Sequence, residues 1–170
     1  MAFALAAILA GCAPASEPEP TSTGAFADEA EAFAAAEETY RAYVDALNAV
    51  DLSDPATFED VYAWTTGEAN VEAREGFTQM HADGWAVGGT STPTVVSPRA
   101  IEGDRSDRAE VAICLDVSDV TLTDATGTSV VGTDRPDVQS MLVTLERSPS
   151  TPTGWAISEF SGREGAPACD

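Results

Sequence analysis

Few residues in this sequence are of the types that carry out chemistry, and their spacing matches no catalytic motif. His81 is the one histidine. A histidine can serve as a general base near neutral pH, although a lone histidine in a helical stretch is more often a surface residue or a hydrogen-bonded core residue. Asp116, Asp119 and Asp124 lie close together in the sequence, but they lack the residue order and the closing glutamate of a calcium-binding loop. We therefore predict no catalytic residue, no metal site and no cofactor.

Cys12 lies in a stretch with a specific chemical use. It ends the sequence Leu9-Ala10-Gly11-Cys12, which follows an apolar run over residues 1–8. This arrangement resembles the lipobox of bacterial lipoproteins, in which the cysteine receives diacylglycerol and becomes the new N-terminus. The run is too short to span a bilayer core of about 30 Å, which takes roughly 20 residues. We expect residues 1–11 to be a signal peptide whose basic beginning precedes Met1, because no Lys or Arg lies before Cys12.

Cys114 and Cys169 remain if Cys12 carries the lipid. Two remaining cysteines usually pair in an oxidising compartment, so we predict a Cys114–Cys169 disulfide. It would close a loop of about 55 residues and contribute on the order of 4 kcal/mol to stability. Two distant thiols and one histidine offer too few ligands for a metal site. We expect this bridge alone to fix the C-terminal residues 162–170.

The composition limits the kinds of partner. The apolar fraction of 44% is that of a globular protein, and the net charge is -21, from 29 acidic and 8 basic residues. Such a charge repels phosphate backbones, so nucleic acid is excluded as a partner. It also opposes contact with anionic headgroups except through a lipid anchor. The scarcity of basic residues and the abundance of Ala, Thr, Asp and Gly resemble the proteins of high-GC actinobacteria.

The elements that must position these residues divide into a tether and one domain. Residues 12–24 contain Pro14, Pro18 and Pro20 and few large apolar residues, so they predict an extended tether after the lipidated cysteine. Residues 25–170 then form a single domain. Apolar spacing predicts helices over residues 25–49, 55–64 and 68–82. Pro55 fits the first position of the second helix, with Asp54 as its N-cap.

The first helix is the longest and the most clearly amphipathic. Its apolar residues fall at spacings of three, four and seven, and they are Phe26, Ala30, Phe33, Tyr40, Val44 and Leu47. From residue 85 onward the pattern changes to alternation. We predict strands over 85–98, 107–122 and 137–148, and a last strand with Trp155, Ile157 and Phe160. The alternation in 107–122 places Cys114 on the more polar face.

Helices followed by antiparallel strands predict an α+β domain. This order resembles the NTF2-like (SnoaL-like, cystatin-like) cone, with about three N-terminal helices packed on a curved antiparallel sheet of four or more strands. The lipobox, the strand over residues 109–120 and the ending Gly154-Trp155-Ala156-Ile157 before Cys169 resemble a narrower group. That group consists of actinobacterial lipoproteins without assigned function, some of them encoded by phages. The likeness covers residues 30–169.

The cone fold occurs in isomerases, dehydratases, cyclases, transport factors and assembly subunits, so the resemblance implies no single function. Our leading hypothesis is a lipoprotein on the outer face of the cell membrane that binds a small apolar ligand or an envelope protein and catalyses no reaction. The alternative is a cone-fold isomerase, dehydratase or hydrolase that uses His81 or a buried carboxylate. Candidate pocket residues are Tyr40, Tyr62, Trp64, His81 and Trp85, although aromatic residues at helical spacing more often form plain core. A cone filled by its own side chains would leave only a protein-interaction role.

Overall fold

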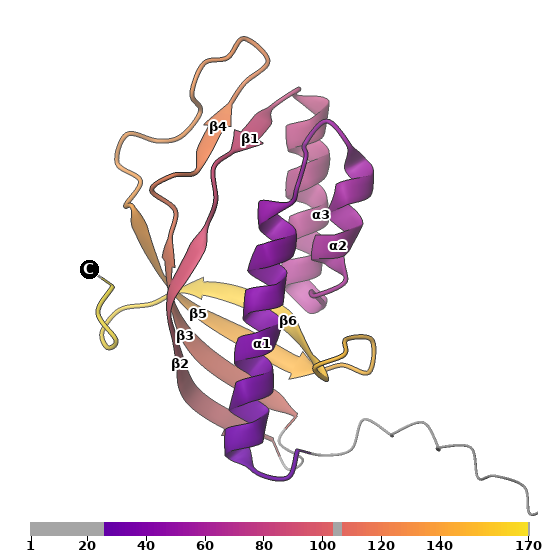
Figure 1. Ribbon diagram of the computed structural model, residues 1–170, viewed down its shortest axis with the longest axis vertical. Coiled ribbons are helices and arrows are strands. Elements are labelled where there is room, and N and C mark those ends of the chain that lie inside the picture. The colour runs from indigo at the N-terminus through magenta and orange to yellow at the C-terminus, as the bar shows by residue number, and fades with distance from the viewer. Residues whose placement is uncertain (1–25, 104–106, 170) are drawn as a thin grey trace, which may run out of the picture.

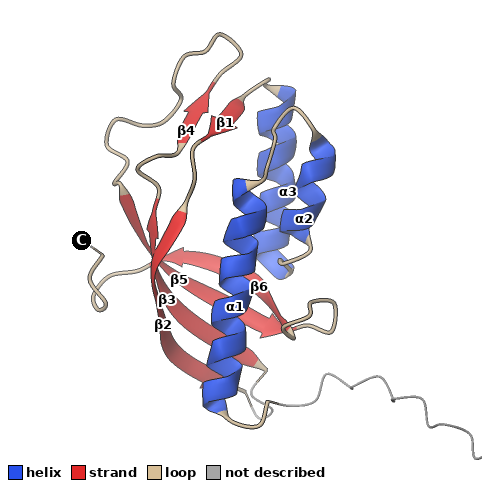
Figure 2. Cartoon of the chain, in the orientation of Figure 1, coloured by secondary structure: helices blue, strands red, loops and turns tan. Residues whose placement is uncertain are grey.

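The computed structural model describes residues 26–103 and 107–169, in which three α-helices pack against antiparallel sheets (Figures 1 and 2). The helices are α1 (Glu29–Asn48), α2 (Phe58–Tyr62), preceded by the short 3-10 helix η1 (Pro55–Thr57), and α3 (Gly67–Ala82). The strands are β1 (Ala86–Gly88), β2 (Thr92–Glu102), β3 (Arg108–Asp116), β4 (Thr121–Thr123), β5 (Val138–Arg147) and β6 (Trp155–Gly162). The predicted α+β architecture is confirmed. The predicted signal peptide (1–11), Cys12 and the tether (12–24) lie outside the described residues.

Local hydrogen bonds fix where α1 begins. The Asp28 carboxylate accepts a bond from the backbone N–H of Glu31 at 2.9 Å, and the Glu31 carboxylate accepts one from the N–H of Ala27 at 2.6 Å. The first bond satisfies a donor that a helix start leaves without an intrahelical partner, and the second ties the residue before the N-cap to the first turn. Asp54 caps η1 in the same way, at 3.0 Å from the N–H of Ala56, as predicted.

One face of α1 packs against the sheet. Ala32, Ala36, Tyr40 and Val44 follow one another at intervals of four and are fully buried. The predicted stripe was wrong at Ala30, which is exposed, because the alanines at 32 and 36 are the ones that let the helix approach the sheet. Trp155 of β6 is fully buried beneath α1, and its indole N–H donates to the carbonyl of Ala32 at 3.0 Å.

The main sheet has the strand order β2-β3-β5-β6, and all its neighbours are antiparallel. β2 contains Pro93 and Pro98, and its register with β3 shifts beside each of them. Prolines and bulges suit an edge strand, because proline donates no ladder hydrogen bond and a bulge bends the strand. In Figure 1, α1 crosses one face of this curved sheet, while α2 and α3 lie beside α1 on the side of β6.

Two predicted strands are each divided in the structure. Residues 85–98 were predicted as one strand, but they contain β1 and the start of β2, separated by Gly89. Residues 107–122 likewise contain β3 and most of β4, separated by a turn in which the N–H of Val120 donates to the carbonyl of Val117. β1 and β4 pair with each other in a separate two-stranded sheet, which extends beyond the main sheet in Figure 1. We call this pair the ribbon.

The C-terminal segment, residues 163–169, returns across the outer face of the main sheet. The predicted Cys114–Cys169 disulfide is present, with the Cα atoms 5.4 Å apart. Cys114 is buried rather than on a polar surface, because this segment covers its face of β3. The expectation that the bridge alone fixes this segment was wrong. Arg163 donates to the carbonyls of Met141 and Pro167, and Arg99 donates to that of Ala166, so hydrogen bonds hold the segment as well.

Candidate functional site

A pocket of about 460 Å³ lies where α1 and α3 end and the ribbon begins. Its walls come from the last turns of both helices, the segment after α1, the ribbon, and the loop between β4 and β5. The lining is mainly aliphatic, and its residues are Leu47, Asn48, Val50, Leu52, Phe77, Met80, Val87, Gly88, Gly89, Ser91, Val120, Leu122, Val131, Gly132 and Arg135. Such a volume and such a lining are typical of sites for small organic ligands.

The helix side of the pocket is anchored by core packing and by one polar clasp. Leu52 and Phe77 belong to a hydrophobic cluster with Phe58, Val61 and Tyr62. The Asn48 side chain donates to the carbonyl of Ser91 at 2.9 Å and accepts from its N–H at 2.8 Å. These two bonds join the end of α1 to the segment between β1 and β2. Because the side-chain oxygen and nitrogen of Asn48 are both hydrogen-bonded to Ser91, the lining stays predominantly apolar.

Gly89 shapes the ribbon side of the pocket. Its φ of 78° is in the left-handed region, where residues with a side chain are strained. A Cβ atom at this position would collide with the backbone carbonyl of Asp119. Gly89 therefore allows the chain after β1 to pass directly against the turn before β4, which sets the width of the ribbon at the pocket.

Arg135 is the charged residue among the described residues that line the pocket. Its Nη2 donates to the carbonyl of Val117 at 2.8 Å and to that of Val120 at 3.1 Å. Both acceptors belong to the turn between β3 and β4, so these bonds hold the guanidinium in place beside Val120, itself a lining residue. The pocket thus combines an apolar lining with one positioned positive charge.

The pocket lining contains no carboxylate and no histidine within the described part of the chain. Among the residues that the structure describes, no Asp, Glu or His side chain is buried. The carboxylates of Asp116 and Asp124 are bound in turns: hydrogen bonds from Ser118 lower the pKa of Asp116, and bonds from Thr126 and Thr128 lower that of Asp124. No group of three potential metal ligands comes together over residues 26–103 and 107–169.

His81 lies at the exposed end of α3 and does not line the pocket. Its Nδ1 is 2.7 Å from the carbonyl oxygen of Leu52, and its ring meets the Phe58 ring edge-on at 6.4 Å. The contact with Leu52 connects the end of α3 to the segment that follows α1. This position gives His81 a packing role on the outside of the pocket.

Tyr40 occupies the core between α1 and the sheet. Burial, reinforced by the nearby Tyr43, raises its pKa, and burial raises the pKa of Tyr43 to about 12. Both phenols therefore stay neutral at physiological pH. The Tyr40 hydroxyl has no hydrogen-bond partner among the described residues, and Tyr40 is not part of the pocket lining.

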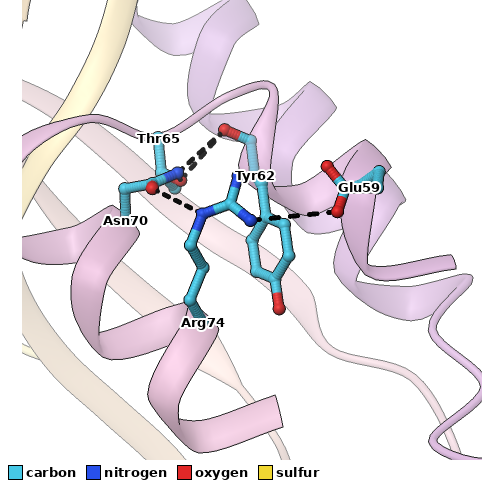
Figure 3. A network of polar contacts seen from close by, with 5 residues as sticks. All are labelled: Glu59, Tyr62, Thr65, Asn70 and Arg74. Carbon is cyan, nitrogen blue, oxygen red and sulfur yellow. Dashed lines mark hydrogen bonds and ion pairs between the residues drawn. The ribbon is translucent and has the colours of Figure 1, made fainter. Parts of the chain in front are cut away.

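Tyr62 belongs to a polar network between α2 and α3, shown in Figure 3. The Arg74 guanidinium lies 4.0 Å from the centre of the Tyr62 ring and donates to the side chain of Asn70 at 2.9 Å. Asn70 in turn donates to the Tyr62 carbonyl at 3.2 Å and to the Thr65 hydroxyl at 2.8 Å. The network fixes the corner between the two helices, which is a structural role.

The two tryptophans singled out from the sequence are both half-buried outside the pocket lining. The carbonyl of Trp64 accepts a bond from the N–H of Ile157 at 2.9 Å, and this bond ties the α2–α3 corner to β6. Trp85 packs against the cluster that contains Phe77. The structure therefore places all five predicted residues around the core and not in this pocket.

Sequence reasoning missed the lining residues, although two signals pointed to them. Leu47, Phe77 and Met80 are apolar residues close to the C-terminal ends of α1 and α3, where polar residues are more usual. Gly88-Gly89 marks a backbone bend close to them in the fold. No sequence pattern near Arg135 indicated that it lines the pocket. Its position depends on hydrogen bonds to carbonyls that lie 15 and 18 residues earlier in the chain.

Comparisons with known proteins show the fold. No protein-family model and no curated protein matches the chain. A candidate aromatic ring hydroxylase from Novosphingobium aromaticivorans is similar in structure, with a TM-score of 0.52, 17% identity, and coverage of 79% of this chain and 94% of that one. The intermembrane space region of the chloroplast protein ARC6 is also similar, with a TM-score of 0.52, 15% identity, and coverage of 75% and 92%. The chain has the NTF2-like cone fold. At these identities the likeness says nothing about activity.

Proposed function

We propose that this protein is an extracytoplasmic lipoprotein whose cone domain binds a small apolar ligand without transforming it. The pocket at the ribbon end is the observation that carries the proposal. Its volume of about 460 Å³ lies within the range of roughly 300–1,000 Å³ usual for small-molecule sites. Each methylene group that leaves water for such a site contributes about 0.8 kcal/mol. An aliphatic ligand of moderate length would therefore bind by burial alone.

The chemistry of the lining favours binding over catalysis. Cone-fold catalysis by proton transfer needs a carboxylate, histidine or tyrosine that contacts the ligand. The described lining contains none of these side chains. His81 lies outside it and is engaged with the Leu52 carbonyl. The enzyme alternative therefore receives no support from this pocket.

Binding can be tested with the neutral fluorescent dye Nile red and two matched variants. Val131 lines the pocket, whereas its neighbour Val130 does not and is 36% exposed. We expect Val131→Trp to fill the pocket and to weaken dye binding at least tenfold, and Val130→Trp to bind as the wild type does. Fluorescence titration measures both affinities, and thermal melts establish that both variants fold.

The pocket-binding proposal would be wrong if the wild type did not enhance Nile red fluorescence, or if the two variants weakened it equally. The first result would leave the domain with a protein-interaction role, in which an envelope protein is the partner.

Anchoring rests on separate support. Cys12 lies in a lipobox-like sequence, and the Cys114–Cys169 disulfide suits an oxidising compartment outside the cytoplasm. No helix within residues 26–103 and 107–169 has the length and apolar character needed to cross a membrane. A lipid on Cys12 would supply the attachment, and residues 13–24 would separate the domain from the bilayer surface.

This anchor is tested by expressing the chain behind a complete signal peptide in a bacterium that processes lipoproteins. We expect the wild type to partition into the detergent phase of a two-phase extraction and Cys12→Ser to move to the aqueous phase. Mass spectrometry should find diacylglycerol on Cys12. An aqueous wild-type protein with an unmodified Cys12 would contradict the proposal.

A further inference from the structure

We propose that the natural ligand is an amphiphile with one apolar chain and one anionic head, and that Arg135 binds the head. This inference rests on the proposal that the pocket binds an apolar ligand and adds the chemical class of that ligand. A guanidinium suits this task because its planar set of N–H donors matches the oxygens of a carboxylate or a phosphate. The two head groups share this chemistry, and binding measurements distinguish them.

Arg135 differs from three other described arginines in having no ion pair with a described carboxylate. It differs from Arg99 and Arg163, which also donate to carbonyls, in lining the pocket. Arg41, Arg74 and Arg108 each lie within 4 Å of a glutamate carboxylate. Arg135 forms no such ion pair with a described residue, although the chain has 29 acidic residues. Its Nη2 donates to two neutral carbonyls, those of Val117 and Val120. A half-buried cation is thus held beside an apolar lining, with no carboxylate of a described residue within 4 Å of it.

Two electrostatic effects oppose the binding of an anionic head near the helices. α1 and α3 both end at the pocket, and the carbonyl-rich ends of helices repel negative charge. The net charge of -21 also repels anions, but solvent ions screen charges beyond about 8 Å at physiological ionic strength. The head is therefore placed at the β4–β5 loop, where Arg135 lies. The chain then extends toward Leu52, Phe77 and Met80 on the helix side.

Calorimetric titration at pH 7 tests this assignment with three ligands of equal chain length: dodecanoate, dodecyl phosphate and neutral dodecanol. The two anions are kept below their micellar concentrations and dodecanol below its solubility limit. We expect the wild type to bind at least one of the anionic ligands about tenfold more tightly than dodecanol. Arg135→Gln should remove that difference and leave dodecanol affinity unchanged within twofold. Arg135→Lys should retain only part of it, because the charge remains but the planar set of N–H donors is lost. Arg99→Gln is the control, since Arg99 also donates to a carbonyl but lies outside the pocket.

The outcomes distinguish recognition of an anionic head by Arg135 from apolar binding in the pocket. Preference for dodecanoate supports a fatty acid as the source, and preference for dodecyl phosphate supports a phospholipid-like source. Equal wild-type affinity for dodecanol and both anions would overturn the inference while leaving apolar binding intact, and this comparison needs no variant. Equal losses for all three ligands in Arg135→Gln would also overturn it, because Arg135 would then only shape the pocket. Failure of all three to bind would overturn both.

Discussion

At the scale of single residues, the disulfide shows how one pair of side chains connects distant parts of the chain. Cys114 lies in β3, and Cys169 lies 55 residues later in the C-terminal segment. Arg163 reinforces the connection, since its guanidinium reaches the carbonyls of Met141, Gly165 and Pro167. The segment is therefore held by one covalent bond and several charge-assisted hydrogen bonds.

Removal of the bridge should destabilise the domain. The hydrogen bonds from Arg163 to Ser140 and Met141 of β5 should remain in the folded state. Cys169→Ser leaves Cys114 in place and creates no core cavity. We expect the free energy of unfolding to fall by about 4 kcal/mol at most, the contribution that the loop-entropy model gives for a loop of this length. Urea unfolding followed by circular dichroism measures the change.

The same denaturation series with the wild type under reducing conditions is the control, because reduction opens the same bond. The two losses should agree. Unchanged stability in both would mean that Arg163 and Arg99 suffice to hold the segment, and that the bridge adds nothing.

Residue patterns predicted local features better than distant ones. The cap at Asp54 and Pro55 was predictable because its hydrogen bond spans two residues. The disulfide was predictable from the number of cysteines. The roles of His81 and Tyr62 were not, because they depend on Leu52 and Arg74, which other segments bring close.

At the scale of elements, the helices were predicted to within a few residues. Their ends carry explicit signals, such as the Asp28–Glu31 capping pair before α1. The strands carried weaker signals, because alternation continues through a bend. The division between β3 and β4 is marked only by the Asp116–Ser118 turn, in which the carboxylate accepts from the N–H and the hydroxyl of Ser118. A turn of this kind is common at a strand end, so the sequence alone did not require the strand to stop there.

That bend has a functional consequence. If β2 and β3 continued straight, β1 and β4 would extend the main sheet. Instead the chain turns at Gly89 and at Val117–Val120, and the separate ribbon forms part of the pocket wall. The pocket was therefore not predictable from the expected elements, since it depends on the division of two strands that were expected to be continuous.

At the scale of the whole molecule, the cone is filled at one end and hollow at the other. Tyr40, Val44, Trp155 and Ile157 occupy the space between α1 and the main sheet with almost no exposed surface. The pocket lies beyond them, toward the ribbon. The filled part stabilises the domain, and the hollow part is available to a ligand. The sequence analysis treated a filled cone and a hollow cone as alternatives, and the structure contains both.

The central claim is that a small apolar ligand enters this pocket. The most direct test is an amide NMR titration of the ¹⁵N-labelled domain with dodecanol, a neutral ligand that does not depend on Arg135. We predict saturable shifts at Gly88, Gly89 and Gly132, which line the pocket, and none at Gly162 or Gly165, which lie at the end of β6 and in the C-terminal segment. Shifts confined to other residues, or no saturable shifts at all, would contradict the account.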